Sequence, residues 1–200
     1  MKKYLLLGVI SLFCLNAQAQ SNSEEIKTYM SAKARYSLLD ADVSTGGYDV
    51  TTVDEDVAGF GVAVGMSYKN SSGMLRTELE YNKNGNSTKS YSLIDFEVET
   101  QSVMLNTYYH LPTGTPLTPY IGGGIGVAHV KGTAEIMGLS GSIKKTNFAW
   151  QAGAGLSYDL TKNFALDLGY RYMDYGNFEK EDVSLDTTAH EFYTGIRVSF

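Results

Sequence analysis

The chain has 200 residues and a mass of 21.9 kDa, enough for a single domain with a sizeable core. Its 16 basic and 22 acidic residues give a net charge of -6, so the basic excess that nucleic-acid binding needs is missing, and we expect no nucleic-acid partner. A single cysteine excludes a disulfide framework and a cysteine-rich metal site, and 43% hydrophobic residues exclude a disordered chain. The 21 glycines and 15 tyrosines, within 12% aromatic residues, indicate β-structure.

The N-terminus has the three parts of a secretory signal peptide. Lys2 and Lys3 give a positive start, residues 4–15 are uncharged and mostly apolar, and Ala17 and Ala19 form an Ala-x-Ala pattern. An N-terminal membrane anchor is the weaker alternative, because a spanning helix needs about 20 apolar residues. We therefore predict a signal peptide over residues 1–19, cleaved after Ala19, and a single domain over residues 20–200.

After this segment, apolar and small or polar residues alternate with a period of two. This alternation predicts β-strands with one apolar face, each close to the length of about 9–11 residues with which a tilted strand crosses a bilayer. Eight stretches carry the pattern: 30–38, 59–68, 75–82, 102–109, 120–127, 147–158, 164–172 and 191–200.

The connections between these stretches are alternately long and short. The short ones are turn-rich and cover residues 69–73, 112–118 and 159–163. The long, polar ones cover residues 39–57, 83–97, 131–145 and 174–189. Outer-membrane barrels have short periplasmic turns and longer extracellular loops. The sequence therefore predicts an all-β fold, an eight-stranded antiparallel up-and-down transmembrane β-barrel.

A soluble barrel with an apolar interior, as in lipocalins, would also show a period of two. The second face of the strands separates the two folds, because it is crowded with glycine, and small residues suit the interior of a narrow barrel. Charges on this face are nearly balanced, and buried charges are tolerated only when they are paired. We predict a charge network inside the barrel formed by Lys33, Arg35, Arg76, Glu78, Glu80, Asp167, Arg171, Glu191 and Arg197.

Aromatic residues fall at both ends of the expected strands, as in the girdles that mark the two membrane interfaces. Tyr68, Tyr109, Tyr158, Phe164 and Phe200 would form the periplasmic girdle. Tyr36, Phe60, Tyr81, Trp150, Tyr172 and Phe192 would form the outer one.

Three stretches resemble the opacity-type and OmpA-like family of eight-stranded outer-membrane barrels: 118–128, 148–158 followed by 164–172, and 191–200. The resemblance implies that the chain is exported to the outer membrane of a Gram-negative cell, where it contacts lipid and lipopolysaccharide. A terminal Phe after an alternating strand looks like the signal that the family's barrel-assembly machinery recognises, which gives Phe200 that role.

The search for reactive groups gives no catalytic, cofactor-binding or metal-binding residue. His110, His129 and His190 lie on separate stretches without ligand spacing, and we expect them at the surface or the barrel rim. No serine adjoins these histidines as a nucleophile would, and the glycines at 122–126 do not fit a nucleotide-binding loop. The acidic connection 39–57 is expected to be solvated, or to collect cations or a basic partner.

The leading functional hypothesis is a non-enzymatic surface protein whose long loops serve in adhesion, surface exposure or envelope integrity, with a host or surface ligand as partner. Two alternatives stay open at this point. One is a small porin or channel for small, and even apolar, solutes, which the glycine-lined strands favour and the nine interior charges oppose. The other is an enzyme that modifies outer-membrane lipid.

Overall fold

The computed structural model describes residues 25–45, 48–85, 87–91, 94–136, 139–180 and 183–200. Nearly all of them are in strands, and this part of the chain contains no helix long and apolar enough to cross a membrane. The strands are β1 (Glu25–Thr45), β2 (Tyr48–Asn70), β3 (Gly73–Asn84), β4 (Ser87–Tyr91), β5 (Ile94–His110), β6 (Leu117–Ile136), β7 (Leu139–Asp159), β8 (Phe164–Lys180) and β9 (Val183–Ser199).

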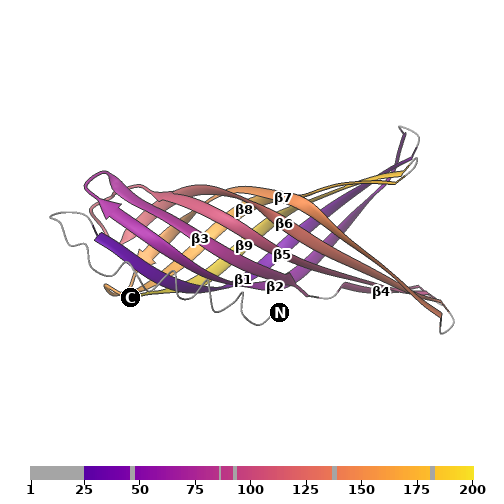
Figure 1. Ribbon diagram of the computed structural model, residues 1–200, viewed down its shortest axis with the longest axis horizontal. Helices are drawn as coiled ribbons and strands as arrows, with labels where there is room; N and C mark the ends of the chain where they lie inside the picture. Colours follow the sequence, from indigo (N-terminus) through magenta and orange to yellow (C-terminus); the bar gives the residue numbers. More distant parts are fainter. Residues whose placement is uncertain (1–24, 46–47, 86, 92–93, 137–138, 181–182) are drawn as a thin grey trace, which may run out of the picture.

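All strand pairs are antiparallel, and the sheet closes on itself (Figure 1). The order is β3-β2-β1-β9-β8-β7-β6-β5-β4, and β3 also pairs with β5. Because β3 pairs with β5 as far as Lys83 and β4 resumes with Ser87 opposite Val98, β3 and β4 are two pieces of one barrel strand. The structure is therefore a closed barrel of eight strands, which confirms the fold predicted from the sequence.

Where the structure describes burial, it alternates along the strands of the barrel, with the apolar side chains outside. Phe148, Leu168 and Ile121 are 62%, 60% and 58% exposed, whereas Glu80 and Glu191 on the other face are fully buried. A soluble barrel would have the opposite arrangement, with apolar residues inside and charged residues in water. The outward band of large apolar side chains requires lipid around the barrel, so the soluble alternative is excluded.

The prediction of four long loops is wrong over most of their length. β1 continues to Thr45 and β2 starts at Tyr48, so nearly all of 39–57 is a paired hairpin, and the other three long connections are likewise mostly strand. Backbone pairing continues wherever two strands lie side by side, whatever the polarity of their side chains. The alternation of apolar side chains stops where the strand leaves the lipid. The end of this alternation therefore marks the membrane boundary rather than the end of the strand.

These continued strands form two separate arms at one end of the barrel (Figure 1). Pairing between β2 and β3 stops at Gly59 opposite Asn84, and pairing between β7 and β8 stops at Trp150 opposite Asp174. Beyond these points β2, β1, β9 and β8 form the first extension, and β4, β5, β6 and β7 form the second extension. We call this end the extension end, and the opposite one, with the short connections, the turn end.

Tyrosine and glycine occupy directly opposite positions on neighbouring strands inside the barrel. A Cβ atom added to any of these glycines would lie less than 3.0 Å from the ring of the facing tyrosine, so each ring covers a space that only glycine leaves open. Part of the excess of both residues in the sequence thus has one steric cause. The four pairs are Tyr29 with Gly65, Tyr108 with Gly122, Tyr120 with Gly155, and Tyr193 with Gly169.

We expect Gly169→Ala to destabilise the barrel by about 1–3 kcal/mol, because the new methyl group forces the Tyr193 ring out of a tightly packed interior. The matched control is Gly123→Ala, where the nearest atom to the added Cβ is the Gln151 carbonyl oxygen at 3.1 Å. Unfolding free energies in lipid vesicles measure both. Equal losses for the two variants would show that the Tyr–Gly contact is not the cause.

The outward face can be tested separately. Leu168→Arg and Val64→Arg place a charge on the lipid-facing band and should cost about 2–4 kcal/mol near the bilayer midplane. Ser71→Arg, in the exposed turn between β2 and β3, should be nearly neutral. A urea titration of refolding into vesicles compares the three variants, and a negligible loss at Leu168 would reverse the assignment of the faces.

Candidate functional site: the barrel interior

Five of the predicted interior charges form a continuous chain of ion pairs. This chain lies in the half of the barrel nearer the extensions. Lys33 Nζ lies 2.5 Å from Glu78 Oε1 and 3.3 Å from Glu80 Oε1. Arg171 Nη1 lies 3.1 Å from Glu80 Oε2, and Arg171 Nε lies 2.6 Å from Glu191 Oε2. The side chains come from β1, β3, β8 and β9, so the chain of ion pairs bridges the barrel interior.

Glu191 is the most heavily shared carboxylate of this chain and brings in a sixth charge. Besides Arg171, it accepts hydrogen bonds from Arg35 Nη1 at 3.2 Å, Ser37 Oγ at 3.0 Å and Tyr175 Oη at 3.1 Å. Its two oxygens are thus fully used, and two guanidinium groups share its negative charge, although Arg171 also pairs with Glu80. The six charges balance, with three basic and three acidic residues.

The remaining three charges form a second cluster nearer the turn end. Asp167 receives Arg76 Nη1 at 2.9 Å on one oxygen and Arg197 Nη2 at 3.5 Å on the other. Arg197 Nη2 also donates to Ser157 Oγ at 2.7 Å. With two bases for one acid, this cluster carries an excess of one positive charge.

Tyrosine rings partly compensate the excess positive charge of the second cluster. The Arg76 guanidinium carbon lies 4.7 Å from the ring centre of Tyr108, 5.4 Å from that of Tyr120 and 5.6 Å from that of Tyr29. The negative face of an aromatic ring attracts a guanidinium group at such distances. The interior tyrosines therefore cover glycines on one strand and solvate cations from others.

The described residues at mid-barrel enclose one small cavity between charged and aromatic side chains. This cavity, lined by Tyr108, Gln151, Arg171 and Tyr193, has a volume of about 10 Å³, at the lower limit for one water molecule. Gln151 Nε2 donates a hydrogen bond to Asn106 Oδ1, and these two side chains also fill the barrel interior. This arrangement gives the pore or channel hypothesis no better support than the surface-protein hypothesis.

The structure places all nine predicted interior residues inside the barrel, and it divides them into the two clusters described above. Phe200 lies at the end of β9 with its side chain 69% exposed, and its N–H donates to Thr28 O at 2.8 Å. Ala17 and Ala19, with the whole predicted signal peptide, lie outside the described residues. Their role stays a prediction.

Sequence reasoning missed several uncharged members of the interior. Tyr108 and Asn106 lie on the face that alternation assigned to the interior, so their parity was the available signal. Tyr29 precedes the first expected strand, and Tyr175 lies in a stretch expected to be a loop. Both were missed because the strands extend beyond the residues in which apolar and polar positions alternate, and the sequence prediction used that alternation alone.

The placement of one histidine at the surface or rim is wrong. His110 is only 1% exposed and stacks on the Tyr120 ring at 4.9 Å between centroids. His129 is exposed and 2.8 Å from Thr146 Oγ1, and His190 lies 2.6 Å from Tyr170 Oη, outside the interior. In the part of the chain that the structure describes, no three His, Cys, Asp or Glu side chains come together as a metal site.

Glu191→Gln tests the balanced chain of ion pairs. We expect a loss of about 3–5 kcal/mol in unfolding free energy, because Arg35 and Arg171 lose the buried charge that they share. Glu99→Gln is the matched control, since Glu99 pairs at 2.8 Å with Lys83 at the solvated rim, where screening weakens an ion pair. A loss for Glu191→Gln no larger than for the control would contradict this interpretation.

Comparisons with known proteins agree with this architecture. The family model described as outer membrane protein beta-barrel domain matches residues 5–200. PagN, an outer membrane protein of Salmonella typhimurium, is 33% identical over 122 residues, which cover 52% of this chain and 51% of PagN. An uncharacterized protein of Brucella abortus is 42% identical over 82 residues, 36% of this chain and 29% of that protein. The chain thus spans about half the length of one curated relative and less than a third of the other.

Two solved structures share the fold. Neisserial surface protein A aligns over 86% of this chain and 97% of its own, with a TM-score of 0.58 and 23% identity. Ail, the attachment invasion locus protein of Yersinia pestis, was solved with the heparin analogue sucrose octasulfate and aligns over 87% and 99%, with a TM-score of 0.52 and 22% identity. Given the family match, the closed barrel and its apolar outer band, the chain belongs to the outer membrane β-barrel proteins and resides in a Gram-negative outer membrane.

Proposed function

We propose that this barrel is a non-enzymatic surface protein that binds a partner through its two extensions and thereby serves adhesion. The observation that carries the proposal is the division of the sheet into two four-stranded arms beyond the closed barrel. The interior carboxylates are already paired with arginine and lysine, which favours recognition at the ends over chemistry within the barrel. The extensions lie on the side where barrels of this family carry their long extracellular connections.

The two extensions differ strongly in charge. The sequence segments 39–57 and 174–189, whose described residues belong to the first extension, contain eleven acidic residues and one basic residue, a net charge of -10. The sequence segments 83–97 and 131–145, whose described residues belong mainly to the second extension, contain three acidic and five basic residues, a net charge of +2. The barrel brings together the two acidic segments, although they are far apart in the sequence.

This charge pattern indicates the chemistry of the partner. At physiological salt, charges act over a Debye length of about 8 Å, so a first extension built from these acidic segments attracts a basic surface and repels a polyanion. The heparin analogue bound to Ail is a polyanion. A ligand of that kind would suit only the second extension of this chain, and we infer that a basic host or bacterial surface protein is the partner of the first.

The strand edges offer a second means of recognition. Beyond Ala58 the outer edge of β2, and beyond Asp174 the outer edge of β8, pair with no strand in the described part of the chain. Such edges present backbone N–H and C=O groups that accept an added strand. The first extension therefore combines an acidic surface with two edges to which an extended basic segment can pair.

The remaining partners follow from the family and the outward surface. We propose that lipid and lipopolysaccharide surround the apolar band, that the barrel-assembly machinery recognises the final strand through Phe200, and that export removes residues 1–19. The exposed aromatic side chain of Phe200, at the end of the outward-facing set on β9, supports the second of these proposals.

We expect cells that display the variant Asp40→Asn, Asp42→Asn, Asp54→Asn to adhere several-fold less to a polylysine-coated surface and to host cells, with the difference fading at high salt. The matched control neutralises acidic residues of the second extension, Asp95→Asn and Glu97→Asn, and should adhere like the unchanged protein. Surface display of each variant is first equalised with an antibody. Equal adhesion of all three proteins at low salt would remove the proposal.

A further inference from the structure

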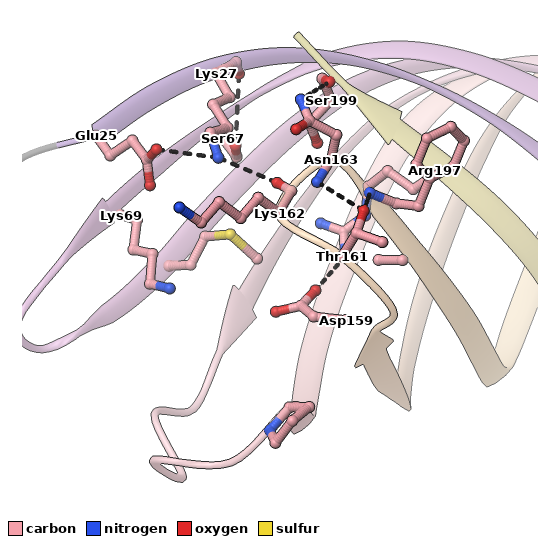
Figure 2. A pocket seen from close by; sticks show the side chains of 14 residues that line it. Glu25, Lys27, Ser67, Lys69, Asp159, Thr161, Lys162, Asn163, Arg197 and Ser199 are labelled. Atoms are coloured by element: carbon pink, nitrogen blue, oxygen red, sulfur yellow. Dashed lines mark hydrogen bonds and ion pairs between the residues drawn. The ribbon is translucent and has the colours of Figure 1, made fainter.

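The turn end of the barrel holds a cavity that the surface function does not use. Its volume is about 510 Å³, within the range of small-molecule sites, and its walls come from β1, β2, β3, β7, β8, β9 and two short turns (Figure 2). Because this end carries the short connections, it faces the periplasm in barrels of this family. The cavity is thus reached from the side of the membrane opposite the extensions.

Four basic and two acidic side chains line the cavity: Lys27, Lys69, Lys162 and Arg197, with Glu25 and Asp159. Glu25 is engaged by Lys27 at 3.0 Å, and Lys27 also donates to the backbone oxygen of Lys162 at 3.2 Å. The amino groups of Lys69 and Lys162 form no ion pair within the described chain. Figure 2 shows both of them on the same side of the cavity as Lys27.

Arg197 carries positive charge into the cavity from the barrel interior. It is only 4% exposed, and the Asp167 carboxylate that faces it is shared with Arg76. Its Nε is buried without a hydrogen-bond acceptor, and its contact with Asp159 is long, at 4.0 Å. A buried guanidinium group with an unused donor is costly unless a further acceptor reaches it.

A neutral donor lies beside these cations. Thr161 Oγ1 accepts the backbone N–H groups of Asn163 at 3.2 Å and of Phe164 at 3.0 Å. With both lone pairs of the hydroxyl oxygen engaged, its hydrogen is left to donate to a further acceptor. The lining of the cavity therefore has an excess of two positive charges, and its hydrogen-bond donors, Thr161 Oγ1 and Arg197 Nε among them, can bind a further acceptor.

We propose that this periplasmic cavity binds the oxyanion of a small solute, a phosphate or carboxylate group, with Lys69 and Lys162 at its mouth and Arg197 at its floor. Charge-assisted hydrogen bonds from ammonium and guanidinium groups are the usual means of holding such groups. The ligand takes the acceptor positions that Asp159 fills only at long range. The site is independent of the extensions, and its occupancy does not require adhesion.

The test uses the full barrel in lipid nanodiscs, titrated by calorimetry at low ionic strength with inorganic phosphate and, separately, with succinate. We expect saturable binding of at least one of them to the unchanged protein. The variant Lys69→Gln, Lys162→Gln should bind about tenfold more weakly. Both side chains are exposed, so their removal leaves no buried charge unpaired. Lys83→Gln, at the opposite end of the barrel, is the control and should bind with unchanged affinity.

A second measurement does not depend on a variant. Saturating anion should protect Lys69 and Lys162, but not Lys83, from acylation by an amine-reactive reagent, as read by mass spectrometry of the peptides. Stronger binding of phosphate than of succinate assigns a phosphoryl ligand, and the reverse assigns a carboxylate ligand. Absence of saturable binding by either anion, or equal weakening by Lys83→Gln, would overturn the proposal.

Discussion

The closure of the sheet by pairing of β3 with β5 is the constraint on which the rest of this structure depends. Lipid offers no partner to backbone N–H and C=O groups, so a membrane-spanning sheet has to close on itself. With eight strands, the closed barrel is so narrow that side chains fill its interior. The Tyr–Gly pairs and the dense network of ion pairs are two consequences of that narrow cross-section.

The narrow interior also determines where function can lie. Charges placed there are largely shielded from water, and each carboxylate among the nine charges contacts at least one base. An interior of this kind holds the strands together and separates the two ends of the molecule. Recognition is left to the two ends, where strands leave the lipid and side chains meet water.

The two ends are built in different ways. At the extension end, the sheet opens into one arm with strongly acidic segments and one with slightly basic segments, and in the described chain the outer edges of β2 and β8 pair with no strand there. At the turn end, short connections enclose a basic cavity of about 510 Å³, suited to a small anion. The excess positive charge of the Arg76, Asp167 and Arg197 cluster lies toward the second of these, which links the interior to the periplasmic side.

The sequence by itself determined the eight strands, their facing and the nine charged residues directed inward, because the parity of each residue along a strand is a local property. Tertiary structure alone decided which charges meet, since Arg35 and Glu191 are 156 residues apart and become neighbours only through barrel closure. It also decided that the strands continue beyond the lipid, that the two acidic segments share one arm, and that His110 is buried. These features depend on the pairing register between strands that are distant in the sequence. Outside the membrane the strands have no alternating apolar residues from which that register could be predicted.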